Sequence, residues 1–147
     1  MKNKKGFTLV EMLVVIAIIA ILSSIFLVGL GGFRKQAYDT RRISDVQKIQ
    51  TFLELYYNQN RAYPADLGLL AGLGTIPTDP ISKLDYKYCT DGSTAPQSYV
   101  INATLDQASS VLGDSGEIDD SSSVCGTGAI DCLDANKQYC VGPGSSN

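Results

Sequence analysis

The hydrophobic and polar positions predict a long helix at the start of the chain. Residues 7–30 are apolar apart from four polar positions before Gly29, which are Thr8, Glu11, Ser23 and Ser24. At about 1.5 Å per residue, a helix of this length spans roughly 36 Å, enough to cross a hydrocarbon core of ~30 Å. We therefore predict that residues 7–30 form a transmembrane helix.

The next segment has an amphipathic pattern. Apolar side chains recur at i, i+3, i+7 and i+10 in Val46, Ile49, Leu53 and Tyr56, the spacing of one helical face. Tyr38, Ile43, Phe52 and Tyr57 widen this stripe, and the opposite face is polar. Residues 31–60 are therefore predicted to continue the helix and to pack against a sheet, ending by Arg61 because Pro64 disfavours helical geometry before it. Gly29, Gly31 and Gly32 mark a weak point in that helix.

The remaining residues, 61–147, predict a small globular head. A connector from Tyr63 to Pro80 contains one short helical turn at residues 67–71, and strands are predicted at 85–89, 98–104 and 138–141. Asp91-Gly92-Ser93 predicts a turn between the first two strands. The fold class is thus α+β, a long N-terminal helix packed on a small antiparallel sheet.

Charge is distributed unevenly along the chain. Eight of the 12 basic residues precede Gln59, and residues 59–147 carry four basic and eleven acidic groups, a formal charge of −7. An acidic head argues against non-specific nucleic-acid binding, which needs a basic surface. The chain has no His and no Trp, which excludes a Ser-His-Asp triad and His-containing zinc sites. We expect a structural protein rather than an enzyme.

Four cysteines lie in the part that should be exported: Cys89, Cys125, Cys132 and Cys140. None forms a C-x-x-C pair, so disulfides are favoured over a metal site. Three pairings are possible. We favour Cys125–Cys132 with Cys89–Cys140, because the strands around Tyr88 and Tyr139 could be neighbours.

Residues 106–136 are polar, and residues 113–120 have the composition of a calcium loop. Their spacing does not match the EF-hand pattern. We predict a solvated acidic loop and no cofactor, with calcium binding as the alternative.

Glu11 is the unusual residue of the apolar segment. A carboxylate is costly in lipid, so it predicts a functional site, the alternative being that it is simply solvated near the headgroups. Lys2, Lys4 and Lys5 precede the apolar run, so the N-terminus should stay in the cytoplasm and the head should face outward.

The string from Lys4 to Glu11, KKGFTLVE, resembles the class III signal of type IV pilins and type II secretion pseudopilins. The resemblance implies a leader of residues 1–6, cleavage between Gly6 and Phe7 by a prepilin peptidase, and N-methylation of Phe7. It implies that Glu11, fifth in the mature chain, guides assembly with other copies into a helical filament. An inner-membrane assembly platform and membrane lipid are the other implied partners. The filament would be extracellular or a periplasmic pseudopilus.

The head carries a second part of the resemblance. Tyr63-Pro64, then Pro77-Thr78-Asp79-Pro80, then Tyr86-Lys87-Tyr88 are similar to the globular half of major pseudopilins and related pilins, as is the strand 99–105. Some major pseudopilins bind calcium in this half, and many pilins close their C-terminal region with a disulfide. Ile81-Ser82 stands where major pseudopilins usually have Trp-Gly, which favours a pilus subunit over a secretion pseudopilin.

Three alternatives remain open. A secretory signal peptide would be cut near Ser23-Ser24, but the apolar run continues beyond that point. A plain signal anchor would hold a tethered domain. From another functional class, the chain could be a membrane-anchored binding module that does not polymerise.

Overall fold

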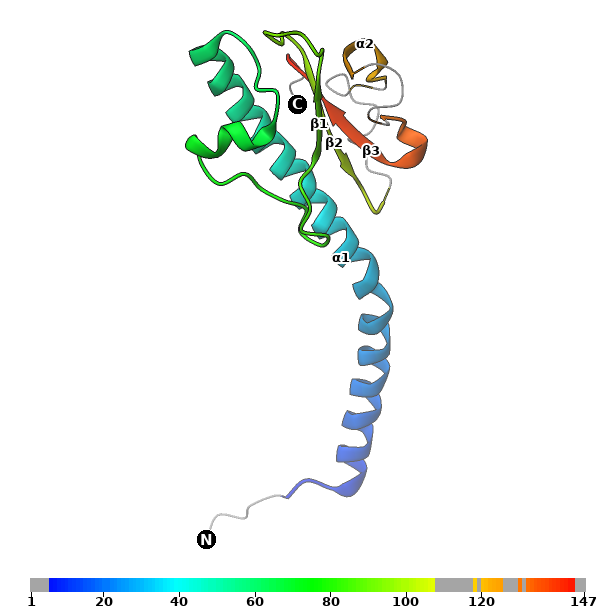
Figure 1. Cartoon of the computed structure of the whole chain (residues 1–147). Helices are drawn as coiled ribbons and strands as arrows, with labels where there is room; N and C mark the ends of the chain where they lie inside the picture. Colours follow the sequence, from blue (N-terminus) through cyan, green and yellow to red (C-terminus); the bar gives the residue numbers. More distant parts are fainter. Residues whose placement is uncertain (1–5, 108–117, 119, 126–129, 131, 145–147) are drawn as a thin grey trace. The chain divides into compact units, whose positions relative to one another are not determined.

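The computed structural model describes residues 6–107, 118, 120–125, 130 and 132–144, without the side chains of residues 25–31 and 134. It divides into two compact units, residues 1–34 and 35–147, which are considered separately below. The first unit contains the start of α1 (Leu9–Asn60). The second contains the rest of that helix and the head (Figure 1).

The helix α1 ends where the sequence predicts. Arg61 follows with a φ of 57°, and its N–H donates to the Tyr57 carbonyl at 2.7 Å. A left-handed residue directly after the last helical one is a common way for a helix to stop. Within the described residues, we find no helix with both the length and the apolar character that crossing a membrane requires.

The head is built on a three-stranded antiparallel sheet in the order β1-β2-β3. Its strands are β1 (Lys87–Thr90), β2 (Tyr99–Thr104) and β3 (Gln138–Val141). Tyr88 lies opposite Ile101, and Ile101 lies opposite Val141, so the alternation of side chains is in register across the sheet. The three predicted strands are confirmed, with the first beginning two residues later than expected.

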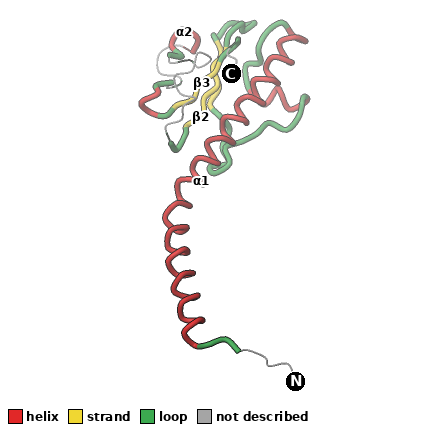
Figure 2. Tube along the Cα trace, turned by 180° about the vertical axis from the view of Figure 1, so that it is seen from behind, coloured by secondary structure: helices red, strands yellow, loops and turns green. Residues whose placement is uncertain are grey.

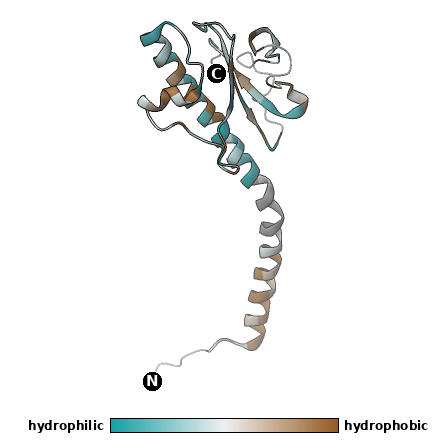
Figure 3. Cartoon of the chain, viewed as in Figure 1, coloured by the Kyte–Doolittle hydropathy of each residue, from teal (hydrophilic) through white to brown (hydrophobic). Residues whose placement is uncertain are grey.

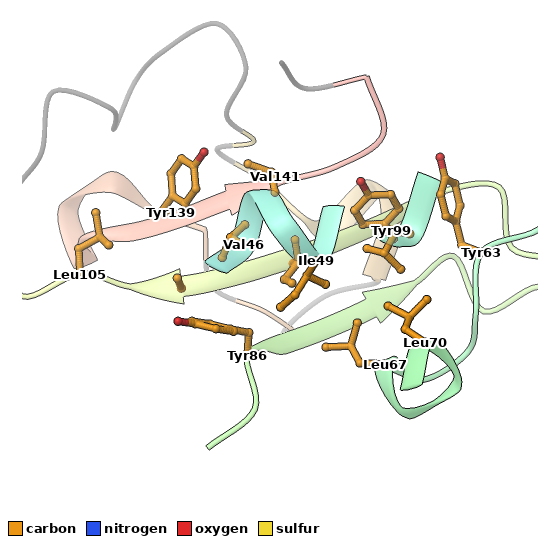
Figure 4. Close-up of a cluster of buried hydrophobic side chains, with 13 residues drawn as sticks. Val46, Ile49, Tyr63, Leu67, Leu70, Tyr86, Tyr99, Leu105, Tyr139 and Val141 are labelled. Carbon is orange, nitrogen blue, oxygen red and sulfur yellow. The ribbon is translucent and has the colours of Figure 1, made fainter. Parts of the chain in front are cut away.

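One face of the sheet packs against the second half of α1. Val46, Ile49 and Leu53 have no exposed surface, and Tyr99 and Ile101 of β2 are equally buried opposite them (Figure 4). The predicted helical stripe is therefore the core of the head. Tyr38 does not widen it as expected, since 41% of that residue is exposed.

A short 3₁₀ helix, η1 (Leu67–Gly72), closes one side of this core. Leu67 and Leu70 are buried in it, and the Asp66 carboxylate caps it by accepting from the Gly68 N–H at 2.7 Å. The predicted helical turn at residues 67–71 is confirmed.

The opposite face of the sheet is covered by a thinner layer that includes α2 (Ser122–Cys125) and η2 (Asp134–Asn136). Figure 2 shows the strands between α1 and α2. Val100 and Cys140 point into a small cluster with Ile130 and Cys132. Gly142 permits close packing beside this layer, since a Cβ there would lie 2.9 Å from the Tyr99 carbonyl oxygen.

Two disulfides hold the outer layer to the sheet, and their pairing corrects the sequence-based one. They join Cys89 to Cys125 and Cys132 to Cys140, each with Cα atoms 5.7 Å apart. The expected Cys89–Cys140 bond was wrong because β2 separates β1 from β3. Two strand spacings amount to about 9.5 Å, beyond the Cα separation that a disulfide tolerates.

We expect peptide mapping of the non-reduced protein to recover both of these disulfides. Replacing Cys89 and Cys125 by Ala should lower the free energy of unfolding by about 4 kcal/mol, and replacing Cys132 and Cys140 by about 2.5 kcal/mol. The difference follows from loop length, because the two bonds separate 36 and 8 positions. Peptides linking Cys125 to Cys132 would contradict the structure.

Candidate functional site

The predicted cleavage site precedes the first helix. Gly6 and Phe7 are exposed and lie outside α1, and 79% of Phe7 is accessible. A Cβ added to Gly6 would meet nothing within 4 Å. The fold of this chain therefore does not itself require a glycine at position 6.

Thr8 and Glu11 form a reciprocal cap at the start of α1. The Thr8 N–H and hydroxyl both donate to Glu11 Oε2 at 2.7 Å, and the Glu11 N–H donates to Thr8 Oγ1 at 3.3 Å. This is the T-x-x-E capping box, in which two side chains satisfy free N–H groups of the first turn. In the uncleaved chain, Glu11 is thus a partner of Thr8.

The sequence carried the signal for this cap, because Thr8-Leu9-Val10-Glu11 has the required spacing. Sequence reasoning missed it by treating Glu11 only as a misplaced carboxylate. The capping role and a role in assembly are separate properties of the same side chain, and they can be separated by substitution.

The first turns of α1 after this cap expose apolar side chains on all sides. Figure 3 colours this stretch as hydrophobic. Each of its large apolar residues is at least 48% exposed: Leu9, Val10, Met12, Leu13, Val14, Val15, Ile16, Ile18, Ile19, Ile21 and Leu22. A continuous apolar surface of this kind marks a contact with lipid or protein.

A second candidate site surrounds Arg42, in the head. Its guanidinium donates from Nε to Asp79 at 2.6 Å, and from Nη1 to Asp39 at 2.8 Å and to Asp106 at 2.9 Å. The Arg42 side chain is 8% exposed. These partners come from α1, from the turn before β1 and from the segment that follows β2, so one guanidinium ties three segments together.

The acidic members of this cluster have further donors. Asp39 accepts from the N–H groups of Asp106 and Gln107 at 2.8 and 2.9 Å. Asp79 accepts from the N–H groups of Ile81 and Ser82 at 2.9 and 2.7 Å. Because Asp39 and Asp79 each accept several directed hydrogen bonds, the cluster fixes the relative positions of the segments that contribute to it.

Hydrogen bonding controls the ionisation of the cluster. Burial favours neutral Asp79, but the Arg42 guanidinium and the two N–H donors outweigh it and lower the pKa of Asp79 to about 2. Burial likewise opposes the charge on Arg42, yet its bonds to Asp79, Asp106 and Asp39 raise the Arg42 pKa above its usual range. The guanidinium and Asp79 are therefore both charged at neutral pH.

Acid should lower the free energy of unfolding of the head, because it protonates Asp79. Because the folded-state pKa lies below the ordinary value of 3.8, the stabilisation is complete above about pH 4 and is lost as pH falls towards 2. We expect a loss of roughly 2 kcal/mol in unfolding free energy across that range. Denaturant unfolding of the detergent-extracted chain at several pH values measures it.

The matched variants for this test are Asp79→Asn and Asp85→Asn. The first should remove much of the dependence between pH 4 and pH 2, and the second, at an exposed carboxylate two residues before β1, should leave it unchanged. Equal pH profiles for Asp79→Asn and the parent chain would contradict the assignment.

Sequence reasoning did not find the Arg42 cluster. Pro77-Thr78-Asp79-Pro80 stands out as a motif, but nothing in the sequence links Asp79 to a residue 37 positions earlier. The only local signal was the spacing of Asp39 and Arg42, which lie three apart on α1.

Among the described residues, the other predicted site residues do not form a single site. The cysteines lie in the head and serve the disulfides described above. The acidic stretch at residues 113–120 falls mostly outside the described residues. Among those the structure does describe, no three potential metal ligands gather at one point.

Known proteins are similar to parts of this chain. A family model for the prokaryotic N-terminal methylation motif matches residues 1–29, which include Gly6, Phe7 and Glu11. The chain is 42% identical over 78 residues to the type IV wide pilus major component PilA4 of Thermus thermophilus, covering 53% of this chain and 60% of that protein.

Similarity to secretion proteins is of comparable extent. The chain is 34% identical over 80 residues to type II secretion system core protein G of Vibrio cholerae, covering 54% of this chain and 55% of that protein. For the Escherichia coli core protein G the values are 34% over 84 residues, 57% and 58%. The chain thus spans between half and two thirds of the length of these curated relatives.

The N-terminal motif, the long helix on a three-stranded antiparallel sheet and these relatives agree with one another. Over about half of its length, the chain is similar to type IV pilins and type II secretion pseudopilins.

Proposed function

We propose that this chain is a structural subunit of a type IV pilus-like filament, not an enzyme. A prepilin peptidase removes residues 1–6, Phe7 is methylated, and copies polymerise through the first part of α1. Before assembly the chain is held in the inner membrane with its head outside the cytoplasm. The filament needs no cofactor, and calcium in the 113–120 stretch is the alternative.

The observation that carries this proposal is the form of α1. The helix α1 contains a capped Glu11, an apolar stretch whose large side chains are each at least 48% exposed, and the stripe that forms the core of the head. The apolar stretch is unsuited to water, and transferring its surface into lipid or among identical helices is favourable. A subunit whose first half of α1 moves from lipid to the helices of neighbouring copies explains why that half is apolar and exposed. The second half of α1 packs within the head in both states.

A type II secretion pseudopilin is the second candidate, supported by the similarity to core protein G in several bacteria. The two candidates differ in where the filament lies. Electron microscopy of cells with and without this chain decides between them. Long filaments recovered by shearing support the pilus, whereas a periplasmic assembly needed for protein export supports the pseudopilin.

A monomeric binding module is the third possibility. It predicts a processed, membrane-held chain that forms no polymer in either compartment. Chemical cross-linking in intact cells, followed by electrophoresis, would then give monomer alone, and the structural proposal would be wrong.

Processing gives the first test of the proposed pathway. The intact mass of the membrane-extracted protein should lack residues 1–6 and carry one added methyl group on Phe7. Gly6→Leu should leave uncut precursor, although the fold has room for the side chain, because the requirement for glycine comes from the peptidase. Cleavage near Ser24, or a mature protein that keeps Lys2, would overturn this pathway.

Glu11 gives the second test. In a filament, its carboxylate pairs with the Phe7 amine of a neighbouring copy, because an unpaired charge in an apolar core costs several kcal/mol. Glu11→Ala should leave cleavage and membrane insertion intact while filament abundance falls sharply. Glu11→Asp should restore assembly poorly, because its side chain is shorter.

Thr8→Val is the control that the capping box provides. It removes the hydroxyl that bonds to Glu11 and receives its N–H, but keeps the carboxylate available for a neighbour. If pairing between copies drives assembly, Thr8→Val should assemble far better than Glu11→Ala. Equal defects would mean that Glu11 acts only as a helix cap.

A further inference from the structure

The turn between Pro80 and Leu84 presents an apolar surface beside an open cavity. Ile81 is 53% exposed and Leu84 69% exposed. Both line a cavity of about 350 Å³, which Tyr86 and Ala103 also line. Turns usually carry polar residues at such positions, so two large apolar side chains here indicate a contact surface.

Hydrogen bonds hold the backbone of this turn in place. The Asp79 N–H donates to the Leu84 carbonyl at 2.9 Å, and the Lys83 N–H donates to the Asp79 carbonyl at 3.0 Å. Lys83 has a φ of 61° and its ammonium bonds to the Pro80 carbonyl at 2.7 Å. Together with the bonds that hold Asp79 to Arg42, these contacts fix the surface before any partner arrives.

The rim of the cavity carries an unused negative charge. Asp85 is exposed and lines the cavity. Among the residues that the structure describes, no hydrogen bond or ion pair holds its carboxylate. Exposed Lys87 lines the same cavity but forms no ion pair with Asp85. The cavity thus has an apolar part at Ile81 and Leu84, with the Asp85 carboxylate and the Lys87 ammonium beside it.

The same chain carries the complementary features elsewhere. Phe33 on α1 is 70% exposed, and Arg34 beside it is exposed and has no ion pair among the described residues. The two side chains leave the helix about 100° apart, within reach of one partner surface because the arginine stem is long and flexible. An aromatic ring can occupy the apolar part of the cavity at Ile81 and Leu84, while the neighbouring cation reaches the Asp85 carboxylate.

We propose that Phe33 of a second copy enters this cavity while its Arg34 pairs with Asp85. Two different surfaces meet, so the contact is heterologous. A heterologous contact that does not close into a ring produces an open helical polymer. The proposal rests on the filament function above and names one of the contacts that holds neighbouring subunits together.

Charge exchange tests the contact in the full-length chain expressed in cells. Arg34→Asp and Asp85→Arg should each lower sheared filament yield about tenfold, because each places like charges at the contact and weakens association. The double variant Arg34→Asp/Asp85→Arg should restore the yield. A double variant no better than either single one overturns the pairing.

Truncation tests the apolar half. Phe33→Ala should lower filament yield about tenfold, the order expected for a buried aromatic ring. Leu69→Ala is the matched control, since Leu69 is 57% exposed on η1 and lies outside the cavity lining, and it should leave the yield unchanged. Normal filaments from Phe33→Ala overturn the proposal.

Two further readouts separate a contact between copies from a folding defect and from a contact with lipid. Thermal unfolding of each extracted variant should match that of the parent chain, because the altered residues are exposed. Processed subunit in the membrane fraction should also be unchanged, since a loss there would mean that the surface contacts lipid instead. If the parent chain itself gives no filaments, the proposed function fails, whereas normal filaments from every variant would overturn this contact alone.

Discussion

The buried Arg42 guanidinium is the interaction on which the head depends. It bonds to carboxylates from α1, from the turn before β1 and from the segment that follows β2, so it helps to set how the second half of the helix lies along the sheet. Removing one partner from such a cluster leaves an uncompensated charge and is costly. The apolar contacts of Val46, Ile49 and Leu53 stabilise the head without fixing an orientation. The hydrogen bonds of the ionic cluster are directional and therefore fix the orientation of the helix on the sheet. The Pro80–Leu84 turn is tied to this cluster, because Asp79 bonds both to Arg42 and to the backbone of the turn.

The central strand β2 explains why so few residues make a stable head. All but the last of its residues are buried, since Tyr99 and Ile101 face α1 while Val100 faces the outer layer. The two faces are stabilised differently. The face towards α1 has an extensive apolar core with no cysteine, whereas both disulfides lie on the other face, each with one end on an edge strand. A thin layer that cannot bury much apolar surface gains more from covalent links.

Much of this architecture could be predicted from the sequence, for identifiable reasons. The stripe through Val46 and Leu53 and the β-rich run at Tyr99–Thr104 are local periodic signals, and both were correct. The disulfide pairing could not be predicted, because it depends on strand order: with β2 in the centre, Cys89 and Cys140 lie on opposite edges. The Arg42 cluster was missed for the same reason, since Asp79 and Asp106 approach only after the sheet has formed. The Thr8–Glu11 cap could have been predicted from the local T-x-x-E spacing. It was missed because Glu11 was interpreted only as a charge in an apolar helix.

That cap changes how the role of Glu11 should be understood. A free carboxylate at the start of an apolar helix would be a large cost in lipid, and assembly would relieve it. Here the Thr8 N–H and hydroxyl already satisfy one of its oxygens, so the subunit before assembly does not hold an orphaned charge. In the proposed filament, Glu11 therefore exchanges neutral donors for the positive amine of a neighbour. Charge-assisted hydrogen bonds are roughly twice as strong as neutral ones, and more so where water is excluded. In that proposal, the free-energy gain from Glu11 is the difference between its bonds to Thr8 before assembly and its pairing with the amine of a neighbour.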